Sequence, residues 1–448
     1  VPVLSEYRET RKPEEVQALI DQTGATLGII LLIISALGVV LAPLLISIFA
    51  PGFIGETEKF ELASKMLQVT FPYILFISLT AFAGAILNTY HHFGVPAFTP
   101  VLLNLSLIGC AIWLAPTFPE EQQVVALAWG VLIAGMVQLS FQVPFLLRLK
   151  LLPVPRFNRD REGVNRILKL MLPTLFAVSI TQINLLIDTL IASFLQTGSI
   201  SWLYYSDRMV ELPLGVFGVA LATVILPNLS TEHARGDNAT FSGIISWALG
   251  LVFIIAIPAA AGLALLSIPI LATLFQYAEF TTNDVVMSSK SLMAYAVGLP
   301  GFILIKIFSS AFFSRQDTST PVKIAVIAMV ANIVLNLLLV GYFQHAGLAL
   351  ASSLSAYLNS GLLYLRLKQA GISVSIKPEI KMLRIACVAV ILMSVFLILL
   401  TPARDVWFQW DVYQRVMQLV IWIVAGMAIY TAGIYIQGIR LRDLISPK

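Results

Sequence analysis

Long runs of apolar residues recur along the whole chain and are separated by short polar segments. A helix must place about 20 apolar residues in a row to cross the hydrocarbon core of a bilayer. Runs of roughly this length predict twelve membrane-spanning helices, preceded by a short helical segment at residues 1–9. The spans are expected near residues 23–49, 62–88, 98–115, 123–147, 166–195, 200–230, 241–275, 287–313, 322–343, 346–365, 382–401 and 413–437. The predicted fold class is therefore an all-α polytopic membrane protein.

The composition favours a membrane protein over a soluble one. Of the 448 residues, 58% are hydrophobic and 12% are charged, whereas about a quarter of the residues in an ordinary soluble domain are charged. Contact of this much apolar surface with water is unfavourable, whereas contact with lipid is not. The net charge of +4 comes from lysines and arginines in short loops. No basic face with interspersed aromatic residues is found, so we expect no nucleic-acid partner.

Lysine and arginine are distributed unequally between the two sides of the predicted membrane. One set of loops, which includes residues 8–12, 148–169 and 366–384, holds most of them. Cytoplasmic loops are enriched in these residues, so this set and the C-terminus are expected to be cytoplasmic. The opposite loops are acidic and are expected to hold only five basic residues, Lys59, Lys65, Lys290, Arg404 and Arg415.

Two short motifs occur twice at nearly the same spacing. The Pro-x-Leu-Ser motif at residues 2–5 recurs at 227–230, and the Thr-Pro-Val motif at 99–101 recurs at 320–322. Each pair marks the same place on a predicted span, and the spacing equals six spans. An even number of spans preserves orientation, so the pattern predicts a parallel repeat. It also predicts that roughly 60 residues, the counterpart of the helix before the second copy, precede this sequence in an intact protein of fourteen helices.

Charged residues are concentrated inside one predicted span, at residues 201–213. A charge at mid-bilayer costs about 2.5–3.5 kcal/mol on insertion scales, so such residues are rare and usually functional. Helical spacing predicts one polar stripe made of Ser201, Tyr204, Arg208, Glu211 and Gly215. Asp207 lies beside it. The alternative is an Arg208–Glu211 ion pair that only fixes helix packing.

Further polar residues within the predicted spans are candidates for the same cavity. The helix is expected to bend or unwind beside a cavity at Pro213, Gly215 and Gly218. Asp188 and Asn184 on the preceding span are expected to form a second polar wall or, alternatively, to make hydrogen bonds between helices. Lys306 is a third candidate, although a side chain that extends to the cytoplasmic interface explains it as well.

An arginine in a membrane cavity suits a phosphate or pyrophosphate, because its planar guanidinium can donate two parallel hydrogen bonds. We find no nucleotide-binding loop, zinc-protease motif or nucleophile elbow, so we predict no catalytic residue and no cofactor. The adjacent pair His91 and His92 does not converge on one helix face, and Cys110 and Cys387 lie in separate apolar runs. Neither pair predicts a metal site or a disulfide.

Four segments resemble one family of bacterial membrane proteins. They are SWLYYSDRMVELPLGVFGVALATVILPNLS (201–230), FPYILFISLTAFAGAILNTYHHFGVPAFTPVLLN (71–104), LFQYAEFT (274–281) and FFSRQDTSTPVKIA (312–325). These segments resemble the MurJ (MviN-type) lipid II flippases of the multidrug/oligosaccharidyl-lipid/polysaccharide exporter superfamily. The resemblance implies two six-helix lobes, at residues 1–150 and 151–370, around a cavity that opens alternately to each side. It also implies that residues 371–448 form two helices with a groove for a polyprenyl tail.

The resemblance further implies roles for the stripe residues. Arg208 matches a substrate-facing arginine, Glu211 and Ser201 match partners in the contacts that gate the cavity, and Asp207 occupies the neighbouring acidic position. The family's first helix and most of its second, with further cavity arginines and an aspartate, have no counterpart in this sequence. A product limited to these residues is expected not to transport.

The predicted function is transport of lipid II, the undecaprenyl-pyrophosphate-linked disaccharide-pentapeptide, from the cytoplasmic to the periplasmic leaflet of the bacterial inner membrane. This involves no covalent chemistry, so we do not expect an enzyme. The expected partners are lipid II, membrane lipids and a coupling ion, with energy from the membrane potential, an ion gradient or downstream consumption. A charge that crosses the membrane gains about 2.3 kcal/mol per 100 mV.

Other functions are kept as alternatives. Within transport, these are export of another polyprenyl-linked saccharide and cation-coupled drug antiport. An intramembrane polyprenyl-phosphate transferase would need an acidic cluster such as Asp-Asp-x-x-Asp, which the sequence lacks.

Overall fold

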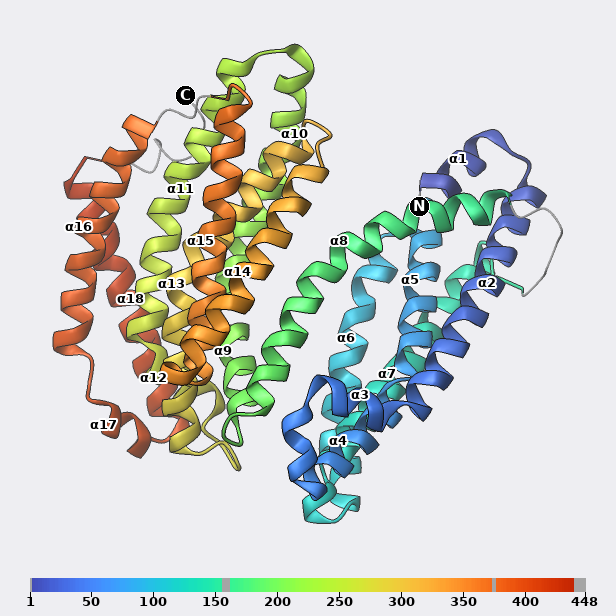
Figure 1. Ribbon diagram of the computed structural model, residues 1–448, viewed down its shortest axis with the longest axis horizontal. Coiled ribbons are helices and arrows are strands. Elements are labelled where there is room, and N and C mark those ends of the chain that lie inside the picture. Colours follow the sequence, from blue (N-terminus) through green and yellow to red (C-terminus); the bar gives the residue numbers. More distant parts are fainter. Residues whose placement is uncertain (1, 155–161, 373–375, 439–448) are drawn as a thin grey trace. The chain divides into compact units, whose positions relative to one another are not determined.

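The computed structural model describes residues 2–154, 162–372 and 376–438, and every regular element in these ranges is a helix (Figure 1). The predicted all-α fold class is thus confirmed. The chain divides into two compact units, unit 1 (Val1–Ser179) and unit 2 (Ile180–Lys448). The lobe boundaries expected at residues 150 and 370 stay predictions.

Unit 1 is built on three helices that pack together, α5 (Tyr73–Thr89), α6 (Gly94–Gly109) and α7 (Val125–Arg148). Helix α2 (Pro13–Val40) packs against α5, and α4 (Thr57–Thr70) packs against α7. The other elements are α1 (Pro2–Thr10), α3 (Ala42–Phe49), the first part of α8 (Glu162–Ser193) and helical turns at Pro51–Gly55, Cys110–Leu114, Ala115–Thr117 and Glu120–Gln122. Buried side chains of α2, α5 and α7 form its core, among them Ile20, Ile86, Leu87 and Leu146.

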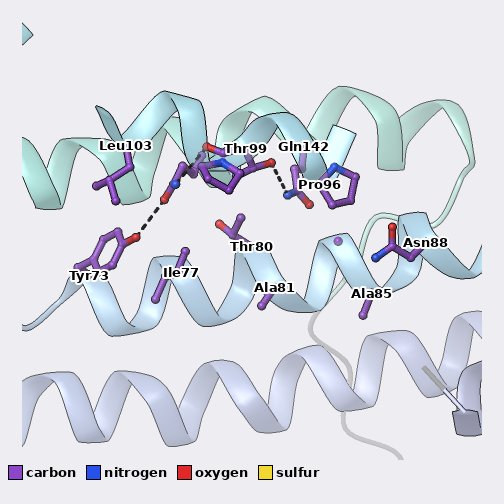
Figure 2. Close-up of a pocket in the computed structure, with 13 residues that line it drawn as sticks. Tyr73, Ile77, Thr80, Ala81, Ala85, Asn88, Pro96, Thr99, Leu103 and Gln142 are labelled. Carbon is purple, nitrogen blue, oxygen red and sulfur yellow. Dashed lines mark hydrogen bonds between the residues drawn. The ribbon is translucent and has the colours of Figure 1, made fainter. Parts of the chain in front are cut away.

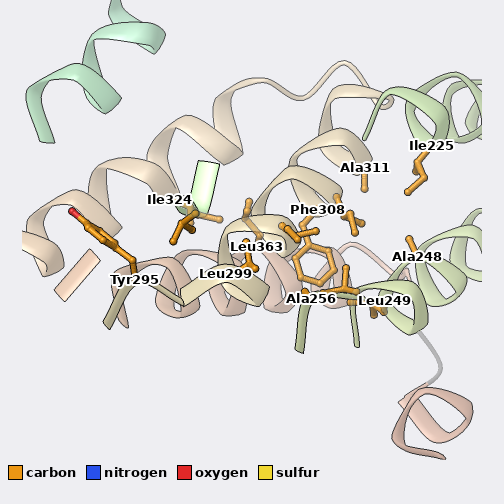
Figure 3. Packing of buried hydrophobic residues seen from close by; sticks show 14 of the residues in the cluster. Ile225, Ala248, Leu249, Ala256, Tyr295, Leu299, Phe308, Ala311, Ile324 and Leu363 are labelled. Carbon is orange, nitrogen blue, oxygen red and sulfur yellow. The ribbon is translucent and has the colours of Figure 1, made fainter. Parts of the chain in front are cut away.

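Unit 2 surrounds one long helix, α13 (Thr282–Phe313), which packs against α9 (Ser199–Pro213), α11 (Asn238–Leu265) and α15 (His345–Gln369). The other elements are the rest of α8, α10 (Ala220–Arg235), α12 (Ser267–Phe275), α14 (Ser319–Phe343), α16 (Ile376–Leu400), α17 (Arg404–Gln409), α18 (Val412–Ile436) and a π-helical turn at Leu214–Val219. Apolar side chains of α10, α11, α13 and α15 gather around Phe308 and Leu299 (Figure 3). Because 56% of the apolar stretch of α13 is buried, this helix is the scaffold on which α9 is held.

The helices confirm most of the predicted spans. Eleven helical segments among the described residues are long and apolar enough to cross a membrane. The remaining predicted span, 166–195, falls on α8, where the apolar stretch described with its side chains is Gln182–Ser193. Large apolar side chains on the spans are at least 74% exposed at Val40, Trp113, Tyr342 and Ile436. Such surfaces are expected where a protein faces lipid.

Some boundaries differ from the prediction. The first span begins at Pro13 instead of residue 23, because proline is favoured in the first helical turn and the acidic residues Glu14 and Glu15 complement the helix dipole there. The predicted span 241–275 is two helices, α11 and α12, which separate at Leu266. Hydropathy does not mark this break, since the residues on both sides are apolar. Pro100, which was expected to open a span, lies inside α6.

The turn between α10 and α11 is capped by Asp237. Its carboxylate accepts hydrogen bonds from the backbone N–H groups of Ala239 and Thr240, both at 3.0 Å. The bond from the Thr240 N–H is the main reason that the pKa of Asp237 is lowered from its ordinary value of 3.8. A lowered pKa stabilises the fold above the unfolded-state pKa, and this contribution is lost as the pH falls through the folded-state value.

Replacement of Asp237 by alanine is therefore expected to lower the melting temperature at pH 7 by about 2 °C. The difference from wild type should narrow as the pH falls below about 4, because the advantage of the ionised carboxylate is lost as the pH falls through its folded-state pKa. Asp237→Asn keeps a capping oxygen and should melt close to wild type at pH 7. Melting curves in detergent at pH 7 and pH 3 measure this, and a difference that is the same at both pH values would contradict an ionised cap.

A buried arginine ties the C-terminal helices to the rest of unit 2. Arg415 was expected among the loop residues, but it lies near the start of α18 and is only 7% exposed. Its guanidinium donates hydrogen bonds to the carbonyl oxygens of Trp407 at 3.0 Å, Phe408 at 3.1 Å and Ala272 at 3.1 Å. These bonds join α12, α17 and α18. The charge can be buried because backbone carbonyls that only the fold brings together accept from it.

Arg415→Met is expected to lower the melting temperature far more than Arg404→Met. Each buried carbonyl that loses its donor costs about 1–3 kcal/mol, whereas the side chain of Arg404 is 63% exposed. Thermal unfolding of both variants in detergent makes the comparison. Equal melting temperatures would show that Arg415 does not hold these helices together.

Candidate functional site

The polar stripe predicted from the sequence lies on one face of α9. This helix begins after Gly198, whose φ of +101° is adopted readily only by glycine. The side of α9 toward α13 is buried, and Ser206 donates a hydrogen bond from there to the Ser288 carbonyl at 2.7 Å. The other side is exposed and carries Ser201, Tyr204, Arg208 and Glu211. The packing of α9 on α13 therefore presents these four side chains on one surface.

Arg208 and Glu211 form an ion pair within this stripe. Arg208 Nη1 lies 2.5 Å from Glu211 Oε2, and the guanidinium carbon lies 5.0 Å from the centre of the Tyr204 ring. Both charged side chains are about half exposed, at 53% and 49%. Their partners in the described part of the chain are on α9 itself. Among the described residues the pair therefore joins no two helices, in contrast to the packing role considered as the alternative.

Asp207 lies at the edge of the stripe and is half-buried. Its carboxylate is close enough to be attracted by Arg208 and repelled by Glu211. It also repels the carboxylate of Asp188 on α8. Asp207 thus interacts electrostatically both with the exposed stripe and with the buried Asp188.

The helix changes its winding directly after the stripe. Pro213 has no N–H to donate to the preceding turn, and residues Leu214–Val219 form a π-helical turn before α10 begins. The sequence predicted that the helix bends or unwinds here, and the structure has a widened, π-helical turn at this place. π-Helical turns often occur at functional sites, and this one separates the stripe from the rest of the span.

Asp188 belongs to a buried polar cluster. Its carboxylate is 7% exposed and accepts hydrogen bonds from Asn336 Nδ2 at 2.6 Å and Ser352 Oγ at 3.5 Å. Asn336 Nδ2 also donates to Asn332 Oδ1 at 3.0 Å. The side-chain oxygens of Asn184 and Asn336 are buried and have no hydrogen-bond partner among the described residues. In the described part of the chain, Asn336, which bonds to Asp188, and Asn184, which lies one helical turn from it on α8, thus each keep an unpaired buried oxygen.

Sequence reasoning missed three members of this cluster, Asn332, Asn336 and Ser352. The two asparagines lie one helical turn apart inside an apolar run, a spacing that marks one face of a helix and was the available signal. Lys306 is exposed on α13, and no contact joins it to the stripe or to the cluster in the part of the chain that the structure describes. Among the described residues, no group of three or more His, Cys, Asp or Glu side chains is placed to hold a metal.

Unit 1 contains a separate pocket that sequence reasoning also missed. It has a volume of about 420 Å³ and lies between α5, α6 and α7 (Figure 2). Tyr73 donates a hydrogen bond to Gln138 Oε1 at 3.3 Å, and Gln142 Nε2 donates to Thr99 Oγ1 at 2.9 Å. The lining carries no charge, and Gln142 Oε1 is buried without a partner in the described residues. This chemistry suits a neutral hydroxyl or amide rather than an ion. The sequence feature that could have indicated this pocket is the pair Gln138 and Gln142, which lie one helical turn apart in an apolar run.

A family model described as lipid II flippase MurJ matches residues 1–421 of this chain. The chain belongs to the MurJ family. It is similar to the probable lipid II flippase MurJ of Vibrio cholerae, with 43% identity over 99% of this chain and 86% of that protein. It is also similar to the probable lipid II flippase MurJ of Haemophilus influenzae, with 42% identity over 100% of this chain and 89% of that protein.

A solved structure of the same family is also similar to this chain. A lipid II flippase MurJ in an inward closed conformation has a TM-score of 0.80 and 26% identity, over 99% of this chain and 90% of its own. An inward-facing multidrug resistance transporter of the MATE family has a TM-score of 0.67 at 17% identity, over 83% of this chain and 85% of its own. The second likeness concerns the fold alone.

Membership of the MurJ family confirms the resemblance drawn from the sequence segments at 71–104, 201–230, 274–281 and 312–325. It also confirms that this multi-pass membrane protein is a transporter and not an enzyme. The drug-antiport and other-saccharide alternatives are not favoured. The roles of Arg208, Glu211, Asp207 and Ser201 stay predictions.

Proposed function

We propose that this MurJ-family protein moves lipid II from the cytoplasmic to the periplasmic leaflet of the inner membrane by alternating access. The observation that carries the proposal is the exposed Arg208 on α9, half accessible and paired only within its own helix among the described residues. The pyrophosphate of lipid II is the group that a guanidinium in such a place recognises best.

The ion pair explains how the empty protein tolerates Arg208. In the absence of substrate, Glu211 neutralises the guanidinium, which lowers the cost of keeping a charge inside a span. A pyrophosphate carries more negative charge than one carboxylate and accepts two parallel hydrogen bonds, so it displaces Glu211. Ser201 and Tyr204 then lie on the same surface as hydrogen-bond partners. Release of Glu211 is the step by which substrate binding changes the contacts around the cavity.

The coupling ion belongs to the same proposal. A single buried carboxylate among neutral oxygens suits a monovalent cation or a proton, and Asp188 has these surroundings. Its repulsion by Asp207 links such a site to the stripe. A cation bound at Asp188 would cancel the repulsion between Asp188 and Asp207. It would thereby change the electrostatic interactions of the charged residues on α9.

Asp188→Asn is expected to keep the hydrogen bonds of the cluster but to remove the dependence of transport on an imposed cation gradient. Asp237→Asn, which removes an exposed charge outside the spans, is the control. The measurement is lipid II movement in proteoliposomes with and without a sodium or proton gradient. If Asp188→Asn keeps the gradient dependence of wild type, the cation does not act at Asp188.

Orientation and division into lobes complete the proposal. The loops rich in lysine and arginine, together with the C-terminus, are placed in the cytoplasm. Residues 1–150 and 151–370 are assigned to the two lobes, and 371–448 to helices that hold the polyprenyl tail of the substrate. Other membrane lipids are expected to contact the exposed apolar surfaces.

The test is replacement of a host's own lipid II flippase. The protein, expressed from its complete gene, should restore growth and externally accessible lipid II in bacteria depleted of that flippase. A vector without insert is the negative control, and membrane abundance is measured in parallel. Failure of an abundant, inserted protein to restore either readout would favour export of a different polyprenyl-linked saccharide.

A further inference from the structure

One tryptophan joins the beginnings of three helices in unit 2. Trp202, in the first turn of α9, is 4% exposed. Its Nε1 donates a hydrogen bond to Oδ1 of Asp284, in the first turn of α13, at 2.7 Å. Its ring lies 4.9 Å from the ring of His345, the first residue of α15. Trp202 is on the same helix as Arg208, yet the proposed transport uses none of these contacts.

The neighbours of the indole ring leave it little freedom to turn. Gly198 lies one helical turn before Trp202, and a Cβ atom at position 198 would lie 2.6 Å from the indole carbon Cζ2. The indole therefore occupies the space that a side chain at position 198 would need. His345 is 2% exposed, and its Nε2 lies 3.1 Å from the carbonyl oxygen of Met287. Since a carbonyl oxygen only accepts, Nε2 donates this bond, which fixes the histidine ring against α13.

The acceptor of the Trp202 bond is also held in place. The second carboxylate oxygen of Asp284, Oδ2, accepts from the backbone N–H of Thr281 at 2.8 Å and from its hydroxyl at 2.6 Å. These bonds belong to the capping box at the start of α13, so they fix the direction of Oδ1. A hydrogen bond to a carboxylate is also stronger than one between neutral groups. Helix α13 thus offers α9 a strong acceptor in a fixed position.

A second hydrogen bond between α9 and α13 lies one helical turn further along both helices. Ser206 Oγ donates to the Ser288 carbonyl oxygen at 2.7 Å, and these residues are 82 positions apart, as are the two residues of the first bond. The next pair at this spacing, Val210 and Leu292, is apolar and belongs to one buried cluster. The two helices therefore run side by side in the same direction, in one register.

The hydrogen bonds decide which side of α9 faces α13. Apolar packing alone favours no one rotation strongly, because lipid tails are as apolar as the side chains, whereas a hydrogen bond requires a direction. Arg208 follows Trp202 by six residues, which places it about 120° from Trp202 around the helix axis. Rotation by one residue would give Arg208 the half-buried direction that Asp207 or Met209 has now. The position of the indole thus determines the exposure of the guanidinium.

We propose that Trp202 is a positioning residue for Arg208. Its hydrogen bond to Asp284 sets the rotation of α9 and thereby directs the guanidinium toward the substrate. Trp202 itself is buried, so it acts through Arg208 and does not contact the substrate. The identity of that substrate, lipid II, rests on the proposed function, but the rotation of α9 can be measured without it.

The first experiment measures which side of α9 faces water. Single cysteines replace Ser201, which is exposed, and Val210, which is 3% exposed, in a protein whose Cys110 and Cys387 are changed to alanine. A water-soluble maleimide then reacts with each protein in nanodiscs, and Ser201→Cys should react much faster than Val210→Cys. Trp202→Phe keeps an aromatic ring but lacks the N–H, and it should reduce this ratio of rates about tenfold.

Thr281→Ala is the matched control. It removes another hydrogen bond to the same carboxylate, the one from the Thr281 hydroxyl, and leaves the Trp202 N–H in place. It should lower the melting temperature but keep the wild-type ratio of labelling rates. The proposal is wrong if Trp202→Phe also keeps that ratio, or if Thr281→Ala reduces it equally.

The second experiment asks whether Trp202 acts through Arg208. Binding of lipid II to the purified protein in nanodiscs is titrated for wild type, Trp202→Phe, Arg208→Ala and the double variant. Trp202→Phe should weaken binding about tenfold and should add no loss in the Arg208→Ala background. The same loss in both backgrounds would overturn the proposal, because Trp202 would then act by another route. If wild type binds no lipid II while the labelling ratio changes as expected, the proposed function is wrong, but Trp202 still sets the rotation of α9.

Discussion

Arg208→Ala is expected to abolish lipid II transport while the protein stays folded and inserted. Arg208 would form a charge pair with the pyrophosphate, and once the substrate covers both groups the loss of the arginine costs about 2–5 kcal/mol of binding, which corresponds to a loss on the order of a hundredfold or more. Folding should change little, because an exposed ion pair contributes at most about 1 kcal/mol and Arg208 is 53% exposed. Arg208→Lys should give an intermediate rate, since lysine keeps the charge but not the two parallel donors.

The readout is externally accessible lipid II in a strain depleted of its own flippase, normalised to membrane abundance. Arg235→Ala is a matched control, because Arg235 also pairs with a glutamate three residues away, Glu232 at 2.9 Å, and its side chain is 68% exposed. It should transport at the wild-type rate. If Arg208→Ala transports as well as Arg235→Ala, then Arg208 is a local ion pair, and the pyrophosphate contact must be sought elsewhere.

Gly298→Val is expected to prevent correct assembly of unit 2. A Cβ atom at position 298 of α13 would lie 2.7 Å from the Cα of Ser353 on α15, which is backbone and cannot turn away. Even one added methyl group should therefore force apart the two helices at the centre of the unit. Overpacking of this kind costs about 1–3 kcal/mol, and valine adds two further carbons, so the larger substitution should leave little folded protein.

Gly361→Val provides the control for this prediction. Gly361 is also a helical glycine, on α15, but a Cβ there would meet nothing within 4 Å. Gly361→Val should fold and melt within a few degrees of wild type, and Gly298→Ala should fall between the two valine variants. Yield after detergent extraction and melting temperature are the measurements. A Gly298→Val protein with the stability of Gly361→Val would show that α13 and α15 do not need this close approach.

The polar stripe shows how far local sequence can predict a site. Positions 201, 204, 208 and 211 share a face in any α-helix, because the spacing of three and four residues is fixed by helix geometry. The segment was therefore expected to place Arg208 beside Glu211, and the structure does so at 2.5 Å. The buried side of α9 carries the apolar residues Trp202, Leu203 and Val210. Their positions in the sequence also indicate which side of the helix is buried. The function of the stripe did not follow from geometry, and it stays a proposal.

The Asp188 cluster shows the opposite case. Asp188 accepts from Asn336, which lies 148 residues away in the chain. No local pattern relates two helices separated in this way, because their neighbours are chosen by the packing of all the helices between them. Arg415 is similar, since its partner Ala272 lies 143 residues away. From the sequence alone, Arg415 was counted among the loop charges. In the fold, its buried side chain forms hydrogen bonds that connect three helices.

The sequence by itself determined the class of the protein, most of its spans and its family, because bilayer thickness, helix pitch and residue spacing act on contiguous residues. Only the tertiary structure decided which polar side chains are buried with partners from distant segments, as Asp188 and Arg415 each are. It also decided which polar side chains stay exposed, as Arg208 does. It alone also produced the pocket at Gln142 and the hydrogen bond of Trp202 to α13. A buried polar group forms hydrogen bonds with the partners that the fold places within about 3 Å of it. Those partners often come from distant segments of the chain, so the local sequence does not predict them.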